Sequence, residues 1–182
     1  MSYPVWSSSI ERVEAGVRRV AERHGDLPVE LLVLSRLLVG LGRDLAANAD
    51  ELFREHDLNE SDMRVLMQLF GREDGTANAG DLVASAAQSP ANITRIADSL
   101  VERGLITRQP GVADRRCVLL RITRRGEHLV RSMLPRVSEH ARRTFGALGP
   151  AEVRRLTADL RRIAATLAEI AAGEKPSEEA AP

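Results

Sequence analysis

The segment that most constrains the fold begins at a strong helix signal and ends in a change of hydrophobic period. The Ser89-Pro90 pair places a capping residue before a proline at the first helical position, and Gly104 provides a helix stop. The runs 105–108 and 117–122 that follow are short and rich in branched residues. The sequence therefore predicts a helix over 89–103 and then a β-hairpin.

Two short helices are expected ahead of this segment. Asn59 is placed to cap the first, and Asn78 with Asp81 opens the second, which is expected over 82–87. Two short helices, a longer helix and a hairpin, in that order over 58–123, indicate a winged helix-turn-helix.

Long amphipathic helices are expected on both sides. Apolar residues recur at helical spacing over 5–24, in the leucine-rich stretch after Pro28, and after Gly149-Pro150. Thr123 can cap a further helix over 124–147, in which Pro135 is expected to cause a kink. The predicted fold class is mainly α with a small β-hairpin wing. The predicted organisation is an additional N-terminal helix (1–27), dimerisation helices (28–57 and 124–172), a winged helix-turn-helix (58–123) and a disordered tail (173–182).

The apolar stripes of the terminal helices predict a homodimer. In the last helix the stripe comprises Val153, Leu156, Leu160, Ile163, Leu167 and Ile170. Burying six large aliphatic side chains contributes on the order of 10 kcal/mol of transfer free energy, and no obvious segment of the chain covers the stripe. The alternative is that both stripes pack inside one protomer.

The charge is segregated along the chain. The formal charge is zero, but residues 89–131 carry nine arginines against four acidic residues, while 1–88 carry nine against fifteen. A basic middle segment in a more acidic chain predicts a patch that faces a polyanion.

The helix over 89–103 has one apolar face and one polar face. Ile93, Ile96, Ala97 and Leu100 share the face that must be buried. Asn92 and Arg95 lie opposite, and these side chains suit contacts with adenine and guanine edges in a major groove. The alternative is an ordinary solvated helix face.

The expected hairpin loop, 109–116 with Pro110 in its turn, carries Asp114, Arg115 and Arg116. An arginine inserted into a narrow minor groove meets concentrated negative potential, and Asp114 can pair with Arg116 and fix its guanidinium. A charged loop without a role is the alternative. The full set of candidate DNA-contacting residues is Ser89, Pro90, Asn92, Thr94, Arg95, Arg108, Asp114, Arg115 and Arg116.

Four stretches together resemble the multiple antibiotic resistance regulator (MarR) family. They are 92–98 (NITRIAD), 100–106 (LVERGLI), 114–116 (DRR) and 122–126 (ITRRG), and the resemblance spans about 28–172. Within the family, 94–98 and 114–117 look most like EmrR-type repressors of drug-efflux operons. The resemblance implies a homodimeric regulator that binds double-stranded operator DNA and releases it when a small aromatic acid or phenolic ligand binds. It also implies that Arg116 enters the minor groove, oriented by Asp114.

An effector pocket is a weaker expectation. The candidate lining residues are Trp6, Phe53, Met63, Arg64 and Met67, since methionine adapts to varied aromatic ligands and an arginine can pair with a carboxylate. Each is more simply explained as a core residue or, for Arg64, as a solvated charge.

Other chemistry is not indicated. The sequence shows no metal-ligand spacing, cofactor motif or nucleophile–base pair, so an enzyme is not expected. No secretory signal or apolar run of membrane-spanning length is present, which predicts a cytoplasmic protein without membrane association. Two other functions stay open: a winged-helix protein-interaction module without DNA binding, and an oxidant sensor that uses Cys117, the only cysteine.

Overall fold

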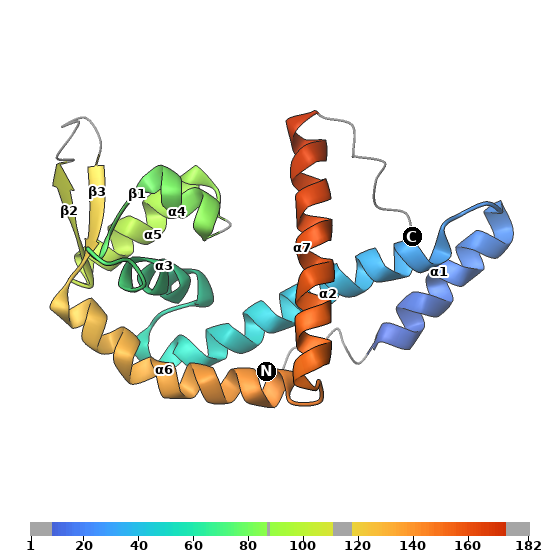
Figure 1. Ribbon diagram of the computed structural model, residues 1–182, viewed down its shortest axis with the longest axis horizontal. Helices are drawn as coiled ribbons and strands as arrows, with labels where there is room; N and C mark the ends of the chain where they lie inside the picture. Colours follow the sequence, from blue (N-terminus) through green and yellow to red (C-terminus); the bar gives the residue numbers. More distant parts are fainter. Residues whose placement is uncertain (1–8, 87, 111–117, 174–182) are drawn as a thin grey trace. The chain divides into compact units, whose positions relative to one another are not determined.

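The computed structural model describes residues 9–86, 88–110 and 118–173. The chain forms two compact units, Met1–Leu134 and Pro135–Pro182. Its elements in chain order are α1 (Ile10–His24), α2 (Val29–Phe53), the 3-10 turn η2 (Arg54–His56), α3 (Glu60–Phe70), β1 (Thr76–Asn78), α4 (Ala79–Ser85), α5 (Pro90–Glu102), β2 (Ile106–Pro110), β3 (Val118–Ile122), α6 (Arg124–Phe145) and α7 (Pro150–Ala172) (Figure 1). The prediction of a mainly helical chain with a β-hairpin is confirmed.

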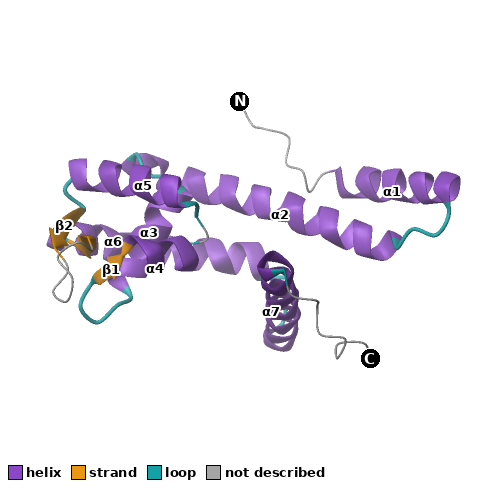
Figure 2. Ribbon diagram, turned by 90° about the horizontal axis from the view of Figure 1, so that it is seen from above, coloured by secondary structure: helices purple, strands orange, loops and turns teal. Residues whose placement is uncertain are grey.

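The first unit contains the predicted arrangement of three helices and a wing. The strands form an antiparallel sheet in the order β1-β3-β2, and the hairpin register runs from Ile106 opposite Ile122 to Pro110 opposite Val118. Figure 2 shows the strands together at the edge of the group formed by α3, α4 and α5. Strand β1 was not predicted. It is three residues long, and only Ala77 in its middle is buried, so it carries no alternating pattern that the sequence could reveal.

Local caps fix where the short helices begin. The Asn59 side chain accepts a hydrogen bond from Asp62 N at 2.9 Å, and the Asp62 carboxylate accepts one from Asn59 N at 3.1 Å. This reciprocal capping box satisfies two amides that helix α3 leaves unpaired. The Asn78 side chain caps α4 with a single hydrogen bond, which it accepts from Asp81 N at 2.8 Å. The caps predicted at Asn59 and Asn78 are confirmed, but α4 begins at Ala79 rather than at residue 82.

Helix α5 ends in a Schellman motif. Gly104 has φ +66° and donates its N–H to the Val101 carbonyl, while Leu105 N donates to the Leu100 carbonyl, both at 2.9 Å. Glycine adopts this left-handed conformation without a Cβ penalty, so the chain can turn directly from α5 into β2. The helix stop predicted at Gly104 is confirmed.

A compact hydrophobic core lies under the short helices and the sheet. Met63, Leu66 and Leu69 of α3 are almost completely buried, together with Leu82 of α4 and Leu120 of β3. Burial of a side chain of this size contributes about 1.5–3 kcal/mol, so the core fixes how α3, α4, α5 and the wing strands pack.

Pro110 does not lie in the turn of the hairpin as expected. It is the last residue of β2 and pairs with Val118. Strand β2 is at the edge of the sheet, where a proline can be accommodated because one side of the strand needs no partner for its N–H. Pro135 lies inside helix α6, as expected, and it is the first residue of the second unit. The kink expected at Pro135 stays a prediction.

The long helices α2 and α7 each have an exposed apolar stripe. Helix α1 packs beside α2, yet Leu31, Leu34, Leu41 and Leu45 of α2 stay exposed in the first unit, Leu31 at 66%. In the second unit, Val153, Leu156, Leu160, Leu167 and Ile170 of α7 are exposed as well. Among the residues that the structure describes, no helix is long and apolar enough to cross a membrane.

Candidate nucleic-acid interface

Helix α5 has the two faces that its sequence predicts. Ile93, Ile96, Ala97 and Leu100 are each at most 3% exposed, so this face is part of the core. Thr94 and Arg95 are exposed on the other side, and Asn92 is half-buried between the two. The helix is therefore fixed by its apolar face and presents a polar face outward.

The first turn of α5 is also open to solvent. Ser89, Pro90 and Ala91 are exposed, and the Ser89 hydroxyl accepts a hydrogen bond from Asn92 N at 3.2 Å, which confirms the predicted cap. The Thr94 hydroxyl donates to the Pro90 carbonyl at 3.1 Å. A helix N-terminus of this kind attracts anions such as a phosphate group.

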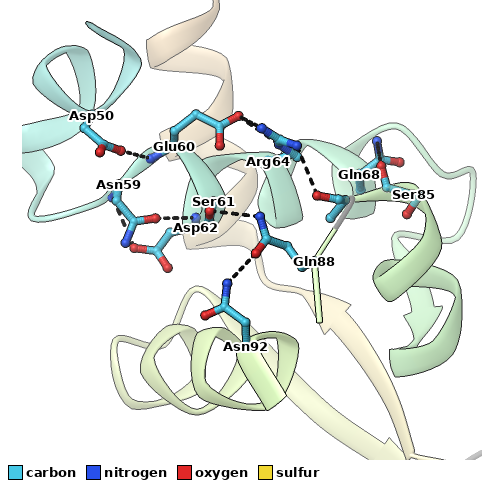
Figure 3. A network of polar contacts seen from close by, with 11 residues as sticks. Asp50, Asn59, Glu60, Ser61, Asp62, Arg64, Gln68, Ser85, Gln88 and Asn92 are labelled. Atoms are coloured by element: carbon cyan, nitrogen blue, oxygen red, sulfur yellow. Dashed lines mark hydrogen bonds and ion pairs between the residues drawn. The ribbon is translucent and has the colours of Figure 1, made fainter. Parts of the chain in front are cut away.

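Arg95 and Asn92 are bound to each other. The Nε and Nη2 atoms of Arg95 lie 3.1 and 2.8 Å from Oδ1 of Asn92. The Asn92 amide in turn donates to Oε1 of Gln88, and Gln88 Nε2 donates to Ser61 Oγ at 3.1 Å (Figure 3). The two predicted base-contacting residues thus belong to one chain of hydrogen bonds that starts on α3.

Gln88 and Ser61 were not identified from the sequence. They are 27 positions apart, and only the packing of α3 against α5 brings them together. Arg103 was also missed: its guanidinium donates to the main-chain carbonyls of His56 and Asp57, which ties the end of α5 to the turn between α2 and α3. Neither contact leaves a local pattern in the sequence.

The predicted wing residues divide into two groups. Arg108 of β2 is described, and its Nη2 lies 2.5 Å from Oδ1 of Asp98 on α5. Both side chains stay substantially exposed, so this pair links the wing strand to the outer face of α5 without being buried. Asp114, Arg115 and Arg116 lie outside the described residues, as does Cys117.

A tight turn connects α3 to the strand at the base of the wing. Asp74 accepts hydrogen bonds from the hydroxyl and the amide of Thr76, the latter at 3.0 Å. These two bonds hold the pKa of the Asp74 carboxyl below its ordinary value. The bond from the Thr76 hydroxyl has the larger effect, and the bond from the Thr76 amide has the next largest. Arg121 of β3 donates to the Asp74 carbonyl at 3.3 Å, which joins the turn to the sheet.

The four candidate effector residues that the structure describes differ in burial and in their contacts. Phe53 and Met63 are buried core residues, Met67 is 37% exposed, and Trp6 lies outside the described residues. Arg64 binds within its own unit: Nε donates to Glu60 Oε1 at 2.8 Å, and Nη1 donates to the Ala86 carbonyl at 3.1 Å (Figure 3). Phe53 and Met63 are thus buried as ordinary core residues, which is the simpler of the two explanations for them.

A groove that was not predicted lies between α1 and α2. Its volume is about 350 Å³, and its lining residues are Arg12, Val13, Gly16, Val17, Val20, Leu32 and Arg36. Aliphatic walls with two guanidinium groups suit a small apolar molecule that carries a carboxylate. Among the described residues, no group of three or more His, Cys, Asp or Glu side chains is arranged to hold a metal ion.

Comparison with known proteins gives a consistent result. Residues 58–118 match the model of the MarR family. The transcriptional repressor MprA of Escherichia coli K12 is 30% identical over 145 residues, which cover 80% of this chain and 82% of MprA.

Solved structures show the same fold. AbsC of Streptomyces coelicolor, a MarR family transcriptional regulator, superimposes with a TM-score of 0.69 at 23% identity, covering 74% of this chain and 91% of AbsC. BpsR of Bordetella bronchiseptica, whose DNA binding is regulated by 6-hydroxynicotinic acid, gives 0.65 at 28% identity, with coverage of 71% and 91%.

Proposed function

The chain belongs to the MarR family of transcription regulators, as its sequence motifs indicated, and from this membership we propose that it is a repressor that binds a pseudo-palindromic operator as a homodimer. A regulator of this family is not an enzyme. In the proposal, residues 58–123 bind the DNA, while 28–57 and 124–172 form the dimer, extended by the helix within 1–27.

The observation that carries the proposal is the division of α5 into a core face and an exposed polar face. Its buried residues hold the helix rigidly, so Asn92, Thr94 and Arg95 project from a fixed surface. Such a helix enters a major groove, where these side chains meet base edges. The exposed N-terminus at Ser89 and Pro90 supplies a phosphate contact that positions the helix.

The wing supplies the second set of contacts. Asp114, Arg115 and Arg116 lie in the sequence between strands β2 and β3, and Arg108 is on β2 itself. Arg116 enters an adjacent minor groove, where a narrow A·T-rich segment concentrates negative potential, and Asp114 orients it.

The exposed leucine stripe of α2 and the stripe of α7 support a homodimer. Apolar surface of this extent in water favours association, and a second copy of the chain offers the same two stripes. A twofold dimer would place its recognition helices about 34 Å apart, which matches one turn of DNA.

A small aromatic acid or phenolic ligand would release the operator by favouring a conformation that does not bind DNA. BpsR, a relative regulated by 6-hydroxynicotinic acid, supports this chemistry. The groove between α1 and α2, with Arg12 and Arg36 at its sides, has walls and charges that suit such an acid.

The test is selection from a duplex pool with a randomised centre of about 30 bp, roughly three helical turns. The selected duplex is then titrated in gel shifts against a scrambled duplex of the same composition. We expect preferential binding to the selected duplex, weakened by about a thousandfold between roughly 50 and 200 mM salt because phosphate contacts release counterions. Equal affinity for both duplexes would overturn the proposal and favour an interaction module without DNA recognition.

A further inference from the structure

Among the residues that the structure describes, Asn92 is the partner of the Arg95 guanidinium and binds it along one edge. Nε and Nη2 both point at Oδ1 of Asn92, at 3.1 and 2.8 Å. An arginine side chain has five N–H donors arranged in a planar fork, so this contact uses the side edge and leaves the end edge formed by Nη1 and Nη2. Two parallel donors at such an edge match the O6 and N7 acceptors of guanine.

Asn92 is itself fixed on the side away from Arg95. Its Nδ2 donates to Oε1 of Gln88, and the Nε2 of Gln88 donates to Ser61 Oγ at 3.1 Å. In this chain each amide offers its oxygen to the outer neighbour and its N–H to the inner one, so the direction of the hydrogen bonds is consistent from α5 to α3 (Figure 3).

The inner end of the chain rests on a rigid element. Ser61 lies in the first turn of α3, next to the capping box formed by Asn59 and Asp62, and α3 contributes Met63 and Leu66 to the core. Ser61, Gln88 and Asn92 are half-buried, whereas Arg95 is exposed. The hydrogen-bonded chain therefore runs from half-buried side chains near the core to an exposed arginine on the surface that is proposed to face the DNA.

We propose that Ser61, Gln88 and Asn92 are positioning residues that hold Arg95 ready to bind a guanine in the major groove. The inference rests on the proposed function and deepens it, because it names the base and the side chain that reads it. Asn92 then acts mainly through Arg95 rather than by contacting adenine. An arginine held before binding loses less side-chain freedom in the complex, so the chain should increase the discrimination for guanine.

The test uses the full-length protein and the duplex selected by it. Each guanine in a half-site is replaced in turn by 7-deazaguanine, which lacks the N7 acceptor, and each adenine by 7-deazaadenine. The loss of affinity on each replacement is measured for the wild type, Arg95→Ala and Gln88→Ala. Gln68→Ala is the matched control, because the Gln68 side chain on α3 also donates a hydrogen bond to another element, to the Ser85 carbonyl at the end of α4 at 3.5 Å, but it is not part of the chain from Ser61 to Arg95.

For the wild type we expect one guanine per half-site whose replacement weakens binding by about tenfold. This loss should disappear in Arg95→Ala, shrink to about threefold or less in Gln88→Ala, and remain in Gln68→Ala. A general loss of stability in Gln88→Ala would weaken binding to all duplexes alike. It would leave unchanged the ratio of the affinity for the guanine duplex to the affinity for the 7-deazaguanine duplex.

Two results would overturn the inference while leaving the proposed function intact. One is that replacing the guanine weakens binding of Gln88→Ala by as much as it weakens binding of the wild type. The other is a loss confined to adenines, which would make Asn92 the reading residue. If the wild type selects no duplex, the proposed function fails and the inference fails with it.

Discussion

A Cβ atom on Gly126 would lie 2.3 Å from the carbonyl oxygen of Leu105. Gly126 is in the first turn of α6, and Leu105 is the last residue of the Schellman motif that ends α5. The Thr123 hydroxyl, 2.8 Å from the Gly104 carbonyl oxygen, accepts a hydrogen bond from Gly126 N at 3.1 Å. The start of α6 is thus packed directly on the backbone that joins α5 to the wing.

This contact predicts that Gly126→Ala destabilises the first unit. The added methyl group would overlap main-chain atoms, which cannot move aside as a flexible side chain can. The free energy of unfolding should therefore fall by about 1–3 kcal/mol. Denaturant unfolding measures the change. Gly16→Ala in α1 is the control, because nothing lies within 4 Å of its Cβ position and the substitution should be neutral or stabilising by about 0.5–1 kcal/mol. Equal stability of Gly126→Ala and the wild type would contradict the packing.

A second prediction concerns the wing. Arg116→Ala should weaken binding to the selected duplex by about 1–3 kcal/mol without changing the oligomeric state, since the proposal assigns this side chain to the minor groove and not to the dimer interface. Fluorescence anisotropy gives the affinity and sedimentation the mass. Arg23→Ala, which removes an arginine from the last turn of α1, is the control. Unchanged affinity of Arg116→Ala would contradict the minor-groove role.

The dimer makes a third prediction. Leu160→Glu places a charge in the exposed stripe of α7, and a twofold interface would bury that charge twice. We expect dissociation into monomers in sedimentation, with a loss of operator affinity of at least about tenfold. Ala165→Glu adds the same charge on the opposite side of the helix and should leave the dimer intact. A dimeric Leu160→Glu would show that the stripe is not the interface.

The effector makes a fourth prediction. Salicylate at about one hundred times its dissociation constant should stabilise the folded protein by about 2.7 kcal/mol, seen as a higher melting temperature. By linkage it should lower the affinity for the selected duplex. Salicylamide, which lacks the carboxylate, should do neither.

The variant Arg36→Gln locates this ligand. If salicylate binds in the groove between α1 and α2, the variant should lose most of the increase in melting temperature. An undiminished increase in Arg36→Gln would exclude the groove as the ligand site.

The sequence predicted features that depend on neighbouring residues. The caps at Asn59, Asn78 and Ser89 and the stop at Gly104 involve partners within about one helical turn, so their residue types show the structure directly. The buried face of α5 was predictable for the same reason, because one helical period defines it.

Features that depend on tertiary packing were missed. Strand β1 exists because β3 lies beside it, with Ala77 opposite Leu120. The contact from Gln88 to Ser61 and the contacts from Arg103 to the carbonyls before α3 join segments far apart in the chain. The sequence therefore predicted Asn92 and Arg95 as DNA-contacting side chains, but it did not reveal that Gln88 and Ser61 are bound in a chain to Asn92.

Hydroxyl-radical footprinting of the selected duplex tests most directly whether α5 and the wing bind DNA together in a symmetric dimer. We expect two protected segments related by twofold symmetry, with centres about 10 bp apart and flanking minor-groove protection that Arg116→Ala removes. A single protected block without symmetry, or flanking protection unchanged in Arg116→Ala, would contradict this account.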